Sequence, residues 1–143
     1  LMKFSDVEFY KQNPVIEFNT PQEEASWKIV SIFKTNTLAE QGKIFNYLIS
    51  EFDTTAKFLE FAREIKIRSL IDIPVNINKN DRLLTLSTCS YEFPEFRTVV
   101  VARKVRKNES KIVNGIESAK KASNPLMPEC WYKRYGGSPP NIS

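Results

Sequence analysis

The 143-residue sequence contains no histidine and only two cysteines, Cys89 and Cys130. Two cysteines in a chain of this length do not make a disulfide framework. No CxxC motif and no His/Cys spacing indicates a metal site, so we expect neither a metal nor another cofactor. No apolar run is long enough to span a bilayer, and no signal peptide is recognisable at the start. These absences exclude a disulfide-rich scaffold and a zinc module as the basis of the fold.

The composition is that of an ordinary globular domain, with 41% hydrophobic and 27% charged residues. The length fits one domain with a core of its own. The net charge is +4, and much of the excess lies in Arg103–Lys107 and Lys120–Lys121. We interpret both runs as a solvated strand end and helix face. The basic stripe that nucleic-acid binding needs is missing, whereas attraction to an anionic cell wall or membrane surface stays open as an alternative.

Two apolar, β-favouring runs dominate the sequence, Leu83–Cys89 and Arg97–Val101. A short polar loop containing Pro94 separates them. If the two runs pair as antiparallel neighbours, Cys89 and Arg97 come together at one end of a sheet. The sequence therefore predicts a thiol beside a permanent positive charge.

A thiol becomes a good nucleophile as the thiolate, which a nearby cation favours. Arg97 can supply that charge or hydrogen-bond the oxygen of a substrate carbonyl. The alternatives are a cysteine that only fills the core and an arginine paired with Glu92 or Glu95. Arg103 lies farther along the strand and is the weaker candidate.

The remaining pattern predicts a mainly β fold of the barrel kind. Apolar alternation indicates strands at 15–18, 26–35, 71–77, 82–88 and 97–106, and helical spacing indicates helices at 3–11, 54–69 and 109–122. Residues 44–52 fit either a helix or a short strand. The Pro-, Gly- and Ser-rich stretch from Asn124 onwards is typical of a tail, loosely ordered or draped over the domain.

The segment Leu84–Cys89 resembles the Thr-Leu-x-Thr-Cys motif of the sortases, with an arginine eight residues further on. The Ser between Leu and Thr, and the helix before the motif, are similar to class B sortases. The stretches from Phe9 to Phe18 and from Val30 to Thr35 are similar to that class as well. The resemblance runs from about Leu1 to about Arg106.

The resemblance implies a closed β-barrel with helices outside it, of which this chain holds the later strands. It implies a sortase-like catalytic domain over 1–107, N-terminally truncated, followed by a C-terminal helix and tail over 108–143. The family's catalytic histidine lies on an earlier strand, and this sequence has none. We expect truncation before Leu1 to account for that; the alternative is a degenerate sortase that does not catalyse.

The resemblance also implies a cysteine transpeptidase. Cys89 would cleave a C-terminal sorting signal after Thr through a thioacyl intermediate, Arg97 would stabilise the oxyanion, and no cofactor would be needed. The partners would be the sorting-signal peptide of surface proteins and a peptidoglycan cross-bridge amine, outside a Gram-positive cell, with membrane association through a segment absent from this chain and no nucleic acid. The candidate substrate-binding residues are Ser87, Thr88, Ser90, Thr37, Tyr47 and Tyr91.

Overall fold

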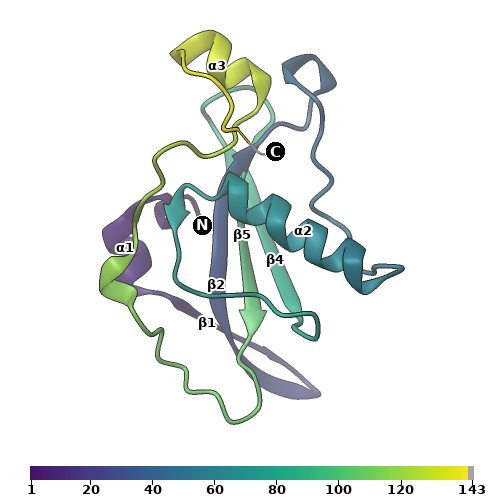
Figure 1. Ribbon diagram of the computed structural model, residues 1–143, viewed down its shortest axis with the longest axis vertical. Helices are drawn as coiled ribbons and strands as arrows, with labels where there is room; N and C mark the ends of the chain where they lie inside the picture. The colour runs from purple at the N-terminus through teal and green to yellow at the C-terminus, as the bar shows by residue number, and fades with distance from the viewer. Residues whose placement is uncertain (142–143) are drawn as a thin grey trace.

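The centre of the fold is a curled, four-stranded antiparallel sheet, seen in a computed structural model that describes residues 1–141 (Figure 1). The strand order is β1-β2-β5-β4. A register irregularity between Ile29 and Ser31 lies within β2, and such bulges increase strand twist. The mainly β prediction is confirmed, and these four strands form a half-barrel. Their bounds are Val15–Thr20 (β1), Glu23–Thr35 (β2), Leu83–Ser90 (β4) and Phe96–Lys104 (β5).

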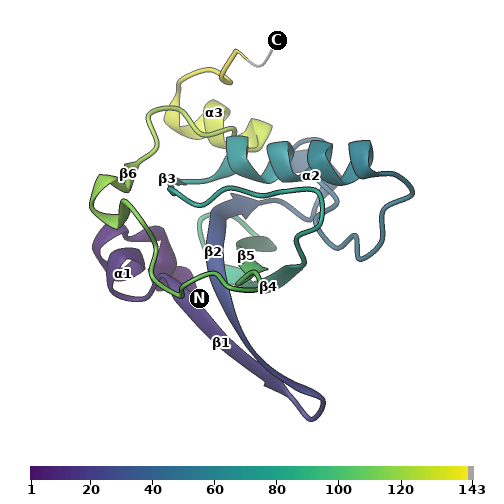
Figure 2. The same ribbon diagram turned by 60° about the horizontal axis from the view of Figure 1, so that its bottom comes forward.

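Helices lie outside the sheet, and the alternation of β5 divides its apolar side chains between two cores. Val100 and Ala102 belong to a cluster with Tyr10 of α1 (Val7–Gln12). Val99 and Val101 belong to a second cluster with Phe61 and Ile65 of α2 (Thr55–Arg68). Figure 2 shows α2 running across the sheet, with α1 beside it. The sheet is thus covered on both faces near its middle.

Helix α2 confirms the predicted helix at 54–69 almost residue for residue. Its inward face buries Phe58, Phe61, Ala62 and Ile65, which are the residues that the i, i+3, i+4, i+7 spacing selects. Thr54 is the N-cap, and its side chain accepts a hydrogen bond from the amide of Lys57. None of the helices in residues 1–141 has the length and apolar character needed to cross a bilayer.

Two predicted elements are shorter than expected. The N-terminal helix is divided at Asp6, which caps α1 and ends the 3-10 turn Met2–Ser5. The strand predicted at 71–77 is a strand only at Ile71–Asp72 (β3), which pairs with Lys120–Lys121 (β6). Pro74 has no N–H for a ladder, and the amide of Val75 bonds to the carbonyl of Ile73 instead. Residues 44–52 have no regular helix or strand, and a short 3-10 turn, Ala39–Gln41, precedes them.

The helix predicted over 109–122 is wrong. The segment is an irregular loop with a 3-10 turn at Ile116–Ser118. Val113 is buried in the cluster that contains Phe61 and Ile65 of α2, whereas Ala119 is buried in the cluster that contains Tyr10 of α1. One short helix cannot fill both cores, so the chain extends around the sheet. Gly115, at φ +74°, makes the left-handed turn that this path requires.

The C-terminal stretch is draped over the domain and ends in a helix that the pattern did not predict. The amide of Leu126 bonds to the carbonyl of Ile67 at 2.8 Å, and Met127 is buried. Helix α3 (Glu129–Tyr135) follows and lies at the same end of the sheet as the β4–β5 loop (Figure 1). The chain therefore returns to the end of the sheet where Cys89 lies.

Candidate functional site

The predicted pairing of Cys89 with Arg97 is present. Strands β4 and β5 are antiparallel, and these two residues are direct partners across the ladder. Residues directly opposite each other point to the same face, so the thiol and the guanidinium lie on one side of the sheet. Thr35 of β2 is the next partner of Arg97 in the same row. Cys89 is exposed, which rules out the alternative of a cysteine that only fills the core.

The guanidinium of Arg97 makes weak contacts within the protein. Its Nη1 donates to the carbonyl of Phe96 at 3.1 Å. Its Nη2 lies 3.7 Å from a carboxylate oxygen of Glu95, whose side chain is 63% exposed. An ion pair this long and this exposed contributes little to stability. Arg97 therefore keeps donors that a ligand oxygen can take.

A surface depression of about 540 Å³ opens beside the thiol. The β4–β5 loop forms most of it, and Arg134 of α3 reaches it from the other end of the chain. It provides a hollow for a ligand between one nucleophile and two guanidinium groups. Its lining residues are Cys89, Ser90, Tyr91, Glu92, Phe93, Pro94, Glu95, Arg97 and Arg134.

A buried polar network lies on the opposite face of the sheet, behind Cys89. The ammonium of Lys34 is 2.6 Å from Glu92 and donates to Thr98 Oγ1 at 3.0 Å and Ser90 Oγ at 3.3 Å. The hydroxyl of Ser90 also donates to Glu92. Burial alone would raise the pKa of Glu92, but the hydrogen bonds from Lys34 and Ser90 outweigh it and leave the pKa below its usual range. This network fixes the loop that follows the cysteine.

The other predicted site residues divide into two groups. Ser87 lies on the Cys89 face, and its hydroxyl is 3.0 Å from that of Tyr47, which ties residues 44–52 to β4. Thr37 donates to the carbonyl of Glu95 at 2.7 Å and so holds the β4–β5 loop. Thr88 alternates to the opposite face, where it pairs with Thr98. Tyr91 is 82% exposed at the loop tip.

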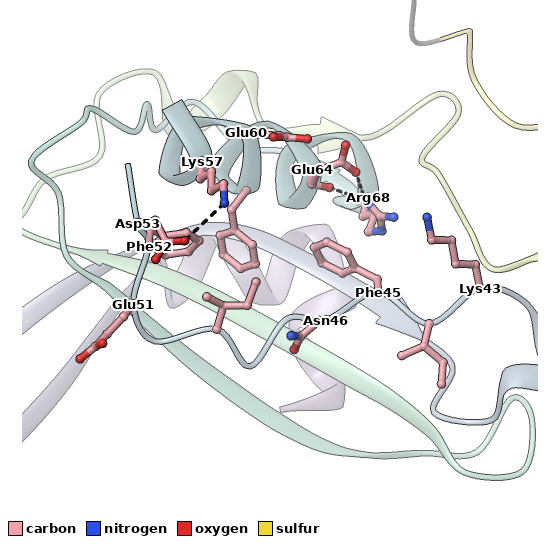
Figure 3. Close-up of a pocket in the computed structure, with 13 residues that line it drawn as sticks. Lys43, Phe45, Asn46, Glu51, Phe52, Asp53, Lys57, Glu60, Glu64 and Arg68 are labelled. Atoms are coloured by element: carbon pink, nitrogen blue, oxygen red, sulfur yellow. Dashed lines mark hydrogen bonds and ion pairs between the residues drawn. The ribbon is translucent and has the colours of Figure 1, made fainter. Parts of the chain in front are cut away.

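Residues 43–53 and α2 line a second hollow, of about 580 Å³, which shares no lining residue with the Cys89 depression (Figure 3). Phe45 stacks on Phe61 at 5.9 Å between ring centroids. The guanidinium of Arg68 lies over the ring of Phe45, 3.9 Å from its centroid, and is held by Glu64 at 2.6 Å. These contacts explain why an irregular segment has a fixed shape. The sequence of residues 44–52, which fits either a helix or a strand, did not predict this hollow.

Three residues of the basic run at the end of β5, Arg103, Lys104 and Arg106, form ion pairs within the protein. Arg103 is buried and makes a bidentate pair with Glu109, at 2.8 Å for both bonds. Arg106 pairs with Asp81 at 2.7 Å, and Lys104 pairs with Glu23 at 2.8 Å. Arg103, Lys104 and Arg106 are therefore occupied by ion pairs within the fold, and the prediction of a solvated strand end is wrong for the buried Arg103. Across residues 1–141, no cluster of three or more His, Cys, Asp or Glu side chains is placed to hold a metal ion.

Sequence reasoning missed Arg134. The composition around it predicts a tail, although Trp131 and Tyr135 at i, i+4 form an aromatic side that packs on Phe93. That spacing was the available signal. Nothing in the sequence says which loop such a face meets, so the position of Arg134 required the structure.

Comparison with known proteins points in one direction. No family model matches the sequence. Sortase B of Staphylococcus aureus (strain NCTC 8325 / PS 47) is 32% identical over 100 residues, which make up 68% of this chain and 38% of that protein. The chain thus spans less than half the length of this curated relative.

Solved structures agree with the sequence comparison. The Staphylococcus aureus sortase B–substrate complex has a TM-score of 0.64 and 30% identity, covering 73% of this chain and 47% of that one. A sortase B complexed with triglycine has a TM-score of 0.63 and 30% identity over the same shares. The predicted sortase-like fold is therefore confirmed.

Proposed function

This chain is a class B sortase-like protein, and on that premise we propose that it acts in a cysteine transpeptidase with Cys89 as nucleophile. One observation carries the proposal. Cys89 is exposed and directly opposite Arg97, on one face of the sheet and beside a depression. A nucleophile with a cationic hydrogen-bond donor next to it is the minimum that acyl transfer through a thioester needs.

The proposed reaction has two halves. The thiolate of Cys89 attacks the carbonyl carbon of Thr in a sorting signal, at the bond between Thr and Gly or Asn, and Arg97 donates to the oxygen as it becomes negative. The C–N bond breaks and a thioacyl intermediate remains, while the leaving amine takes up the proton that Cys89 lost when it became the thiolate. The amino group of a cell-wall cross-bridge peptide then displaces the sulfur and restores the thiol. The solved sortase B structures with a substrate and with triglycine support both halves by analogy.

The depression and the neighbouring Cys89 face of β4 would hold the peptide. Ser87 and Tyr47 lie along the Cys89 face, and Tyr91 is exposed beside it. Ser90 would contribute its backbone N–H, since its hydroxyl is engaged by Lys34 and Glu92. Thr37 would act by holding the β4–β5 loop, and Thr88 has the weakest case because it points to the opposite face. The setting would be the cell envelope.

The test is a covalent trap read by intact mass. The protein would be incubated with sorting-signal peptides that carry Thr-Gly or Thr-Asn, with the scissile carbonyl replaced by a thiol-reactive ketone. We expect one adduct on the parent protein and on Cys130→Ser, the matched control for the second thiol, and none on Cys89→Ala. Labelling that persists in Cys89→Ala would contradict the proposal.

The second candidate is a sortase-like peptide-binding module that does not turn over. The lack of histidine favours it, because the leaving amine needs a proton donor. It predicts that unmodified sorting peptides bind, as measured by fluorescence anisotropy, and that neither cleavage nor a hydroxylamine-sensitive thioester appears by mass spectrometry. Release of the peptide's C-terminal fragment by the parent protein, but not by Cys89→Ala, would exclude it.

A further inference from the structure

Helix α3 inserts a second arginine into the Cys89 depression. Arg134 lines the depression together with Cys89 and Arg97. It is forty-five positions from Cys89 in the sequence, so its arrival depends on how α3 docks. That docking is specific enough to be argued from contacts.

An aromatic cluster anchors α3 to the loop that follows Cys89. Phe93 packs on Phe96 at 4.8 Å between ring centroids, on Trp131 at 6.1 Å and on Tyr135 at 6.2 Å. Trp131 and Tyr135 are themselves 4.7 Å apart. Phe96 is fully buried at the start of β5. The cluster therefore connects α3 to a fixed point of the sheet.

The same rings position the guanidinium of Arg134. Its central carbon lies 5.6 Å from the ring centroid of Phe93 and 5.5 Å from that of Tyr135. These distances fall within the range of cation–π attraction. An aromatic surface holds a guanidinium by its face and leaves the N–H groups at its edge free to donate.

The charges around the depression leave Arg134 without a carboxylate. Glu92 is taken by the buried Lys34 at 2.6 Å, and Glu95 faces Arg97 at 3.7 Å. Among the ion pairs of residues 1–141 none involves Arg134, and the nearest in the sequence joins Lys133 to Glu129. A guanidinium that is oriented, exposed and unpaired at the rim of a ligand-sized hollow suits a planar carboxylate, which it can bind with two parallel hydrogen bonds.

We propose that Arg134 is a carboxylate-binding residue of the Cys89 depression and selects peptides with a carboxylate near the bond that Cys89 attacks. The inference rests on the proposed function for its peptide ligand. The carboxylate can belong to an acidic side chain or to the peptide's own C-terminus, and both present the same planar group.

The first arm of the test needs no peptide. In a Cys130→Ser background, Cys89 would be alkylated with iodoacetate, which carries a carboxylate, and with neutral iodoacetamide. The ratio of the two rates cancels differences in thiolate content, because the nucleophile is the same. We expect Arg134→Gln to lower this ratio about fivefold at low salt, the size of one screened charge contact near a surface.

Lys133→Gln is the matched control. It removes the same charge one residue away, from a lysine that pairs with Glu129 at 3.0 Å and is not part of the depression. We expect it to leave the ratio within a factor of two. An unchanged ratio in Arg134→Gln, or an equal fall in Lys133→Gln, would overturn the inference. Circular dichroism of both variants would verify that α3 and the sheet are retained.

The second arm identifies the source of the carboxylate. Sorting-signal peptides would compete with iodoacetamide for Cys89, in pairs that differ as Asp and Asn after the Thr, or as C-terminal acid and amide. We expect Arg134→Gln to weaken protection only by the member that carries the carboxylate. If no peptide forms an adduct in the trapping experiment while the alkylation ratio still depends on Arg134, the transpeptidase proposal fails and the carboxylate site stands.

Discussion

Two arginines on the same face of one strand have opposite surroundings. Arg97 lies near the start of β5 and Arg103 near its end, six residues apart, so both side chains point to the α2 side. Arg103 is 2% exposed and donates to Glu109 through two bonds of 2.8 Å and to the carbonyl of Asn76 at 2.7 Å. Within residues 1–141, the one ion pair of Arg97 is with Glu95, at 3.7 Å.

The difference shows how burial decides what an arginine can do. A buried guanidinium must have its donors satisfied by the protein, because leaving them unpaired costs several kcal/mol. Arg103 therefore fixes the loop at Glu109, and its buried guanidinium donates to Glu109 and Asn76 instead of to a ligand. Arg97 remains partly hydrated, and its protein contacts are weak enough to be exchanged for a substrate oxygen. The burial and pairing of Arg103 therefore count against it as the arginine that acts beside Cys89.

The same substitution, arginine to methionine, at positions 103 and 97 is the most direct test of this difference. Arg103→Met removes one partner of a buried network and leaves Glu109 and Asp81 short of a counter-charge. We expect a loss of about 3–5 kcal/mol in the free energy of unfolding, measured by urea denaturation. Arg103→Lys should recover part of it by retaining the charge. A loss below about 1 kcal/mol for Arg103→Met would mean that the network is not structural.

Arg97→Met should reverse the pattern. Because its ion pair is long and exposed, we expect the free energy of unfolding to change by less than about 1 kcal/mol. Loss of the oxyanion donor should lower the rate of thioacyl formation at Cys89 by roughly 10²- to 10³-fold. The measurement is the appearance of the covalent species by quenched-flow mass spectrometry. If Arg97→Met were destabilised and still formed the thioacyl species at the parent rate, Arg97 would have a structural role and not the role of oxyanion donor.

Acid titration sharpens the comparison at the Arg103 end. Hydrogen bonds from Arg103, above all, and from Lys28 hold the pKa of Glu109 well below its usual value near 4.5. A lowered folded-state pKa contributes stability that is complete above the unfolded pKa and is lost as the pH falls through the folded one. We expect Glu109→Gln to cost about 2 kcal/mol at pH 7 and progressively less below about pH 4.5. Urea midpoints of parent and variant from neutral to strongly acidic pH test this.

If the difference in unfolding free energy between the parent protein and Glu109→Gln did not change with pH, the ion pair of Glu109 with Arg103 would not be what stabilises the fold. Asp81, whose burial is outweighed by its bond from Arg106 so that its pKa is also lowered, provides the neighbouring control. Asp81→Asn should also lose stability relative to the parent protein at pH 7, and this loss should shrink as the pH falls, since Asp81 pairs with Arg106 and Arg103.

The sequence was most informative where local pattern and pairing agree. Alternation located β4 and β5, and the short loop between them set a register that puts Cys89 opposite Arg97. Spacing located the buried face of α2. In each case a residue's environment follows from neighbours within a few positions, which is what periodicity encodes.

The features that pattern could not supply depend on distant partners. The apolar spacing at 109–122 looks helical, but Val113 and Ala119 are needed in two different cores. Residues 44–52 take their shape from stacking on α2 and from the Tyr47–Ser87 contact. Arg134 reaches the site because an aromatic face of α3 meets Phe93. Tertiary contacts override local preference in all three.

The smallest effect that we expect lies within the β4–β5 loop itself, between two glutamates three positions apart. Glu92 is bonded by the buried Lys34 and by Ser90, whereas the side chain of Glu95 is 63% exposed and its carboxylate lies 3.7 Å from Arg97. Glu92→Gln should cost about 1 kcal/mol of unfolding free energy, the net contribution of a charged hydrogen bond at a partly exposed site. Glu95→Gln should change it by a few tenths of that at most. Because Glu92 fixes the loop beside Cys89, Glu92→Gln should also alter the iodoacetamide rate of Cys89 more than Glu95→Gln does. Equal effects of the two substitutions, on stability and on alkylation, would show that the network behind Cys89 does not position it.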